Sequence, residues 1–107
     1  MSVKTISVSE LKKWIDEKKD FQLIDVRESN EHTFCNIGGD LIPLSTVLVQ
    51  KNRISKDKPV AVLCRSGKRS EMAIQQLESA EGFTNLYNIE GGILRWSDEI
   101  DSSVPKY

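Results

Sequence analysis

Cysteine is scarce in this sequence: 107 residues contain only Cys35 and Cys64, which lie far apart in the chain. So few cysteines exclude the disulfide-dense framework of a small secreted protein, although one disulfide between them is possible. Long hydrophobic runs are also missing, and the N-terminal MSVKTISVSE lacks the apolar core of a signal peptide. We therefore expect a cytoplasmic protein without a membrane span, whose cysteines are thiols.

A strong excess of either charge is absent as well, since the formal net charge is −1. A nearly neutral chain has no general electrostatic attraction to nucleic acid or to anionic lipid, so neither is expected as a partner. The charged fraction of 29% and the hydrophobic fraction of 38% are ordinary for a globular protein. Without linkers or repeats, residues 1–107 are predicted to form one domain, and nothing suggests an obligate oligomer, so we expect a monomer.

Short apolar segments alternate along the chain with segments of helical periodicity. This alternation is typical of parallel strands joined by helical crossovers, so we predict an α/β fold with a small parallel sheet of about five strands and helices on both faces. The predicted strands are 5–6, 21–26, 41–42, 60–63 and 86–89. The predicted helices begin after Ser7, at Ser29 as a cap, near Ser45, after the CRSGKR turn and at GGILRW.

The densest chemistry follows the apolar run VAVL, where the chain continues CRSGKRS. Ligands of parallel sheets bind beyond the carboxyl ends of the strands, and loop amides with a helix N-terminus can bind an anion there. Arg65, Lys68 and Arg69 add positive charge, and Gly67 permits a tight turn. Such surroundings favour a thiolate, so Cys64 is a candidate nucleophile beside an anionic substrate. The alternative is a small buried cysteine followed by solvated loop charges.

Five segments, in order, resemble the single-domain rhodanese sulfurtransferases: ISVSELKKWI, LIDVRESNEH, NIGGDLIPL, VAVLCRSGKRS and NLYNIEGGILRW. The resemblance covers essentially the whole chain. It implies that Cys64 takes a sulfur atom from thiosulfate or another donor, becomes a persulfide and releases sulfite. Cyanide or a thiol would then accept the sulfur, and a protein persulfide is a possible partner. The resemblance implies no cofactor and no metal.

The resemblance also implies roles for the loop that follows Cys64. Its backbone amides, including those of Ser66 and Gly67, would cradle the transferred sulfur. The side chains of Arg65, Lys68 and Arg69 would hold the sulfonate end of the donor.

Two further elements match the family and are expected to be structural. Asp25 and Arg27 correspond to its Asp-x-Arg element, which supports the active site through hydrogen bonds and ion pairs. Gly91, Gly92 and Trp96 correspond to the element that begins the last helix.

The sequence departs from the family at CNIGG, where Gly-His-Ile-Pro-Gly is common. The missing histidine is not the nucleophile, so the chemistry should survive. Cys35, in this segment, is either a resolving thiol that takes sulfur from Cys64 or a small residue in a glycine's place.

Three other functions compete with sulfur transfer. A cysteine-based phosphatase usually has Cys-x5-Arg, but Ser70 stands where that spacing needs arginine, and the shorter loop of this superfamily goes with sulfur. A binding module is a second alternative, against which the intact Cys64 loop argues. A domain that acts mainly as a sulfur carrier for a protein partner stays open as an alternative. A zinc site from His32, Cys35 and Cys64 would lack any Cys-x-x-Cys pair, so His32 is expected to be a surface residue.

Overall fold

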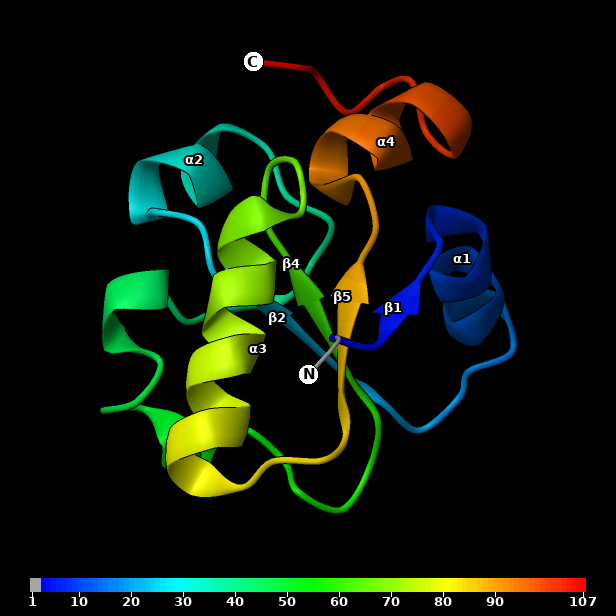
Figure 1. Ribbon diagram of the computed structural model, residues 1–107. Helices are drawn as coiled ribbons and strands as arrows, with labels where there is room; N and C mark the ends of the chain where they lie inside the picture. Colours follow the sequence, from blue (N-terminus) through cyan, green and yellow to red (C-terminus); the bar gives the residue numbers. More distant parts are fainter. Residues whose placement is uncertain (1–2) are drawn as a thin grey trace.

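The computed structural model describes residues 3–107 and contains a five-stranded sheet (Figure 1). The strands are β1 (Thr5–Ile6), β2 (Gln22–Asp25), β3 (Asp40–Leu41), β4 (Val60–Leu63) and β5 (Leu86–Ile89). Their spatial order is β1-β5-β4-β2-β3, and all four pairings are parallel. Strand β4 lies at the centre and all of its residues are buried, as expected for a parallel strand covered on both faces.

Helices pack on both faces of this sheet. They are α1 (Val8–Asp16), α2 (Ser29–Phe34), α3 (Lys68–Glu81) and α4 (Gly92–Glu99). Along β4, Val60 and Val62 belong to a buried cluster with residues of α3, whereas Ala61 and Leu63 belong to a second cluster with residues of α1 and α4. Alternate residues of a strand point to opposite faces, so α3 covers one face and α1 with α4 the other. The predicted α/β fold class is therefore confirmed.

The ends of two helices follow the predicted signals and one does not. The Ser7 hydroxyl caps α1 by accepting a hydrogen bond from the Glu10 N–H at 3.0 Å. Gly82 ends α3 in the left-handed region at φ 69°, where glycine is favoured. The predicted cap of α2 at Ser29 is wrong, because Ser29 is already helical. The cap is Glu28, which forms a reciprocal capping box with Glu31.

The helix predicted over 45–51 is also absent. The segment instead contains the end of one short 3₁₀ turn, Leu44–Thr46, the turn residues 47–50 and the start of a second 3₁₀ turn, Lys51–Arg53. Val47 is buried, but the neighbouring Leu48 and Val49 are exposed, so the segment has no continuous apolar face that packing could stabilise as a helix.

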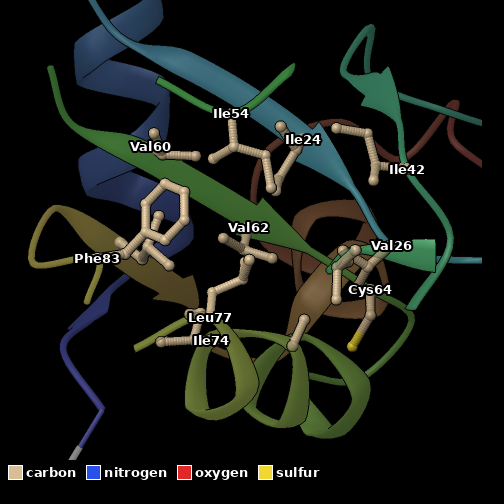
Figure 2. Close-up of a cluster of buried hydrophobic side chains, with 13 residues drawn as sticks. Ile24, Val26, Ile42, Ile54, Val60, Val62, Cys64, Ile74, Leu77 and Phe83 are labelled. Carbon is tan, nitrogen blue, oxygen red and sulfur yellow. The ribbon is translucent and has the colours of Figure 1, made fainter. Parts of the chain in front are cut away.

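The carboxyl end of β4 is the part of the fold that positions the site. In Figure 1 the loop after β4, α2 and the start of α4 all lie beyond the arrowheads of the central strands. Figure 2 shows Cys64 at one end of the cluster that packs against α3, with its sulfur directed toward that helix. Within residues 3–107, the helices fall short of the length and hydrophobicity that spanning a bilayer requires.

Leu77 of α3 provides a test of this packing, because its side chain is completely buried in the cluster of Figure 2. We expect Leu77→Ala to lower the free energy of unfolding by about 2–5 kcal/mol through lost burial and a residual cavity. Leu48→Ala is the control, since Leu48 is 39% exposed and its truncation should cost well under ~1 kcal/mol. Urea unfolding measures both, and equal losses would contradict the assignment of Leu77 to the core.

Candidate active site

The Cys64 side chain lies directly after β4, at the base of the loop that leads into α3. Its Sγ accepts a hydrogen bond from the Gly67 N–H at 3.0 Å and lies 3.3 Å from Ser70 Oγ. Cys64 is only 1% exposed, whereas Arg65 and Ser66 are exposed. The sulfur therefore lies beneath the loop rather than in an open cavity.

The first turn of α4 holds the backbone of this loop. The Ile93 N–H donates to the Cys64 carbonyl at 3.0 Å, and the Leu94 N–H donates to the Arg65 carbonyl at 3.2 Å. A Cβ on Gly92 would lie 2.5 Å from both carbonyl oxygens, and Gly92 has a φ of +60°. A side chain at this position would force the loop away from α4. Gly91 and Gly92 thus lie where the loop meets the helix.

Asn88 of β5 holds the other side of the loop. Its Nδ2 donates to the Gly67 carbonyl at 3.0 Å, and its Oδ1 accepts a hydrogen bond from the Ser70 hydroxyl. Ser70 and Asn88 are both buried. The sequence pattern did not single out either residue for a role, although a polar Asn88 within the buried strand LYNI is a signal that the side chain must have polar partners.

Arg69 pairs with Glu31 of α2. Its two terminal nitrogens donate to the two carboxylate oxygens at 2.7 and 2.8 Å. These hydrogen bonds raise the pKa of Arg69, although partial burial opposes them. The Arg65 guanidinium lies 5.0 Å from the centre of the Tyr107 ring, in a cation–π contact. Lys68 is exposed and has no ion-pair partner among residues 3–107.

Asp25 and Arg27 form a buried ion pair of 2.7 Å at the end of β2. Burial alone would lower the pKa of Arg27, but its hydrogen bonds with Asp25 and Tyr107 outweigh burial and raise it. Arg27 also donates to the Cys35 carbonyl at 2.7 Å, which ties β2 to the end of α2. His32, expected at the surface, is instead only 24% exposed and its Nδ1 lies 3.0 Å from Asp25.

Glu31 and Tyr107 join these two ion pairs into one network. The Tyr107 hydroxyl accepts from Arg27 at 3.0 Å and donates to Glu31 at 2.7 Å. Chiefly because of its hydrogen bonds with Arg69, the pKa of Glu31 falls from its ordinary 4.5 to about 2, while burial raises the pKa of Tyr107. Neither residue was predicted for the site. Glu31 lies in a family-like segment, but nothing in the sequence indicates Tyr107.

Cys35 and Cys64 are both free thiols and have different surroundings. Cys35 is buried, with its sulfur 3.5 Å from the Pro105 carbonyl oxygen and 3.9 Å from Arg27 Nη1. Over residues 3–107, histidine, cysteine and carboxylate side chains form no group of three that could hold a metal ion.

A cavity of about 510 Å³ lies at the opposite end of the sheet from Cys64. Its lining includes Gln22, Asp40 and Lys58, which stand at or just before the amino ends of β2, β3 and β4. Since ligands of parallel sheets bind at carboxyl ends, the size of this cavity does not make it the active site.

Comparison with known proteins identifies the family. A family model described as Rhodanese-like domain matches residues 7–99. The chain belongs to the rhodanese-like domain family. A crystal structure of a rhodanese-like domain protein from Staphylococcus aureus aligns with a TM-score of 0.82 and 31% identity, covering 98% of this chain and 99% of that one.

The chain matches only part of the length of its relatives with curated names, which are longer proteins. The uncharacterized protein YqhL of Bacillus subtilis is 45% identical over 80 residues, covering 74% of this chain and 63% of that protein. The adenylyltransferase and sulfurtransferase UBA4 of Candida glabrata is 33% identical over 96 residues, covering 79% of this chain and 22% of that protein. The chain therefore spans less than two thirds of the length of each of these two relatives.

The Glu31–Arg69 pair predicts an acid-dependent stability. A carboxylate whose pKa is lowered in the folded state stabilises the fold above its unfolded pKa, and this contribution disappears as the pH falls from 4.5 through about 2. We expect Glu31→Gln to be less stable by about 1–3 kcal/mol at neutral pH, because it leaves Arg69 without its charged partner. The difference from wild type should shrink as the pH falls.

Denaturant unfolding of both proteins at a series of pH values measures this difference. Tyr107→Phe removes one hydrogen-bond donor to Glu31 but leaves the negative charge of Glu31 in place. We expect this variant to be destabilised at neutral pH as well, but by less than Glu31→Gln. A wild type and a Glu31→Gln variant that differ equally at every pH would contradict the role of the carboxylate.

Proposed function

We propose that this protein transfers a sulfane sulfur from thiosulfate or a persulfide donor to cyanide or a thiol, through a persulfide on Cys64. The observation that carries the proposal is the hydrogen bond of 3.0 Å from the Gly67 N–H to Cys64 Sγ, at the N-terminus of α3. An amide donor and a helix N-terminus both favour negative charge on the sulfur. Membership of the rhodanese-like family and a relative named as a sulfurtransferase support the same chemistry.

The reaction has two displacement steps. In the first, the Cys64 thiolate attacks the outer sulfur of thiosulfate, a new S–S bond forms, and sulfite leaves with the electron pair of the broken bond. In the second, cyanide attacks the outer sulfur of the persulfide, and the electron pair of the S–S bond stays on Cys64 Sγ as a thiolate. Thiocyanate leaves, and no external oxidant or reductant is needed.

The loop side chains have different roles in this proposal. Lys68 and Arg65 are exposed next to the buried sulfur and are suited to bind the sulfonate of a donor. Ser66 and Gly67 contribute backbone amides. Arg69 acts through its pair with Glu31, which joins the loop to α2, and Asp25 with Arg27 supports α2 from β2.

A phosphatase is disfavoured by the same geometry. A cysteine-based phosphatase needs a cation that can neutralise the charge developing on phosphate. Here both terminal nitrogens of Arg69 are bonded to Glu31, and the arginine would have to leave that partner to serve this purpose. A carrier role remains compatible with the site, because a persulfide on Cys64 could equally be passed to a protein thiol in a reducing cytoplasm.

The nucleophile can be tested directly by intact mass spectrometry. After treatment with thiosulfate, we expect the wild type to gain the mass of one sulfur atom, mapped to Cys64, and to lose it when cyanide is added. Cys64→Ser should gain no sulfur and should have no thiocyanate-forming activity, while remaining folded.

Cys35→Ala is the matched control for the second thiol. The hydrogen-bond partners of Cys35 do not include Cys64, so this variant should keep activity within about twofold. Turnover by Cys64→Ser would contradict the proposed mechanism, and a collapse of activity in Cys35→Ala would make Cys35 a participant.

Lys68 is expected to bind the donor rather than to support the fold. Lys68→Ala should raise the KM for thiosulfate roughly two- to fivefold, since an exposed charge pair contributes ~0.5–1 kcal/mol, and should leave the melting temperature nearly unchanged. Lys13→Ala, at an exposed lysine of α1, is the control and should change neither quantity. An unchanged KM at low ionic strength would argue against donor binding by Lys68.

A further inference from the structure

A buried chain of hydrogen bonds ends at the sulfur of Cys64. The Gly67 carbonyl accepts from Asn88 Nδ2 at 3.0 Å, Asn88 Oδ1 accepts from the Ser70 hydroxyl, and Ser70 Oγ lies 3.3 Å from Cys64 Sγ. Cys64, Ser70 and Asn88 are all buried, so water cannot readily replace one of these partners. The number of hydrogen atoms available along this series of hydrogen bonds therefore determines whether Ser70 donates a hydrogen bond to the sulfur or accepts one from it.

The orientation of the Asn88 amide follows from its partners. The Gly67 carbonyl can only accept, so Asn88 directs its NH₂ group there and directs its oxygen to Ser70. That oxygen can only accept, and Ser70 has one hydroxyl hydrogen, which it therefore gives to Asn88. Ser70 then faces the sulfur with a lone pair. This arrangement fits a protonated Cys64, whose S–H donates to Ser70.

A thiolate at Cys64 changes the match of donors and acceptors between Cys64 and Ser70, because the thiolate has no hydrogen to donate. Two acceptors would then face each other at 3.3 Å unless the hydroxyl hydrogen turns from Asn88 to the sulfur. Hydrogen bonds to ionised acceptors are stronger than those to neutral ones, so the sulfur should win this competition. Only rotation about the Cβ–Oγ bond of Ser70 is required, and no heavy atom has to move.

We propose that Ser70 is a further catalytic residue, whose hydroxyl hydrogen turns from Asn88 to Cys64 Sγ as the persulfide releases its outer sulfur. This inference rests on the proposed sulfur transfer. In the persulfide, Sγ is bonded to two atoms and the negative charge lies on the outer sulfur. When an acceptor bonds to that outer sulfur, the electron pair of the S–S bond passes to Sγ, next to Ser70. A donor aimed at an atom where charge develops lowers the barrier of that step.

The two half-reactions should therefore respond differently to loss of the hydroxyl. During sulfur release, charge appears on Sγ and Ser70 stabilises it. During loading, the charge is present on Sγ at the start and moves away from it, so the same hydrogen bond does not favour the transition state over the thiolate. A role of Ser70 in holding the loop would instead slow both half-reactions together.

The test measures the two half-reactions separately by rapid quenching and intact mass spectrometry. The protein is loaded with thiosulfate, freed of excess donor and mixed with cyanide. We expect Ser70→Ala to release sulfur about tenfold more slowly or worse, as estimated for one hydrogen bond to a charged group, and to load within about threefold of wild type. Ser70→Thr retains the hydroxyl and should recover most of the release rate. Ser55→Ala, at a part-buried serine near the amino end of β4, should change neither rate.

Two outcomes would overturn the role of Ser70: release by Ser70→Ala at the wild-type rate, or equal slowing of loading and release. The unpaired Asn88 oxygen could prevent Ser70→Ala from folding. In that case the release rates are compared between the single variant Asn88→Leu and the double variant that carries both Asn88→Leu and Ser70→Ala, since both lack the Asn88 oxygen. The added substitution should again slow release about tenfold, and no slowing would overturn the inference. A wild type that takes up no sulfur contradicts the proposed function itself, whatever the Ser70 variants do.

Discussion

The site depends on hydrogen bonds that fix three carbonyl groups of the loop around the sulfur. The carbonyls of Cys64 and Arg65 accept from the first turn of α4, and that of Gly67 accepts from Asn88 of β5. In a trans peptide the C=O and the N–H point in opposite directions. Fixing these carbonyls therefore also fixes the opposite directions of the amides that follow them, which under the proposed function face the anionic substrate. Gly92 makes this possible, because any side chain there would meet the carbonyl oxygens.

Most of the charged side chains next to the loop are paired with one another. Two cations and two anions, Arg27, Arg69, Asp25 and Glu31, form a network that is neutral as a whole and is joined by Tyr107. This network joins β2, α2 and the start of α3. Arg65 and Lys68 are exposed and make no ion pair within residues 3–107, so under the proposed function they are the loop cations left to bind a donor.

The sequence could predict those parts of the fold that depend on local patterns. The buried run 60–63, the helix that ends at Gly82 and the loop between them follow from spacing alone, and the family-like segments place Asp25 and Arg27 beside one another. Contacts between distant positions could not be predicted in this way. The pairing of Glu31 with Arg69 joins residues 38 apart, and the bond from Arg27 to Tyr107 joins residues 80 apart.

The prediction of a helix over residues 45–51 is wrong for a related reason. Its apolar residues suggested a helix, but whether they form a helical face depends on which of them the sheet can cover, and the core receives Val47 alone. Similarly, the sequence around Ser70 shows only a serine in the first turn of a helix. Its role depends on Asn88 of β5, which accepts a hydrogen bond from its hydroxyl. A single sequence contains both residues but not their proximity, since 18 residues separate them.

The near-complete burial of Cys64 is consistent with the transfer of a single atom. In the proposed reaction a sulfur atom needs room only for itself, while the bulk of its donor or acceptor would remain outside, among the exposed residues Arg65, Ser66 and Lys68. A tetrahedral phosphate would need a wider loop and a free arginine, and neither the length of this loop nor the pairing of Arg69 provides them. Burial would also limit water near the proposed persulfide, so the charge that returns to Sγ would have to be stabilised by protein groups. The Gly67 amide supplies one hydrogen and Ser70 is in position to supply a second.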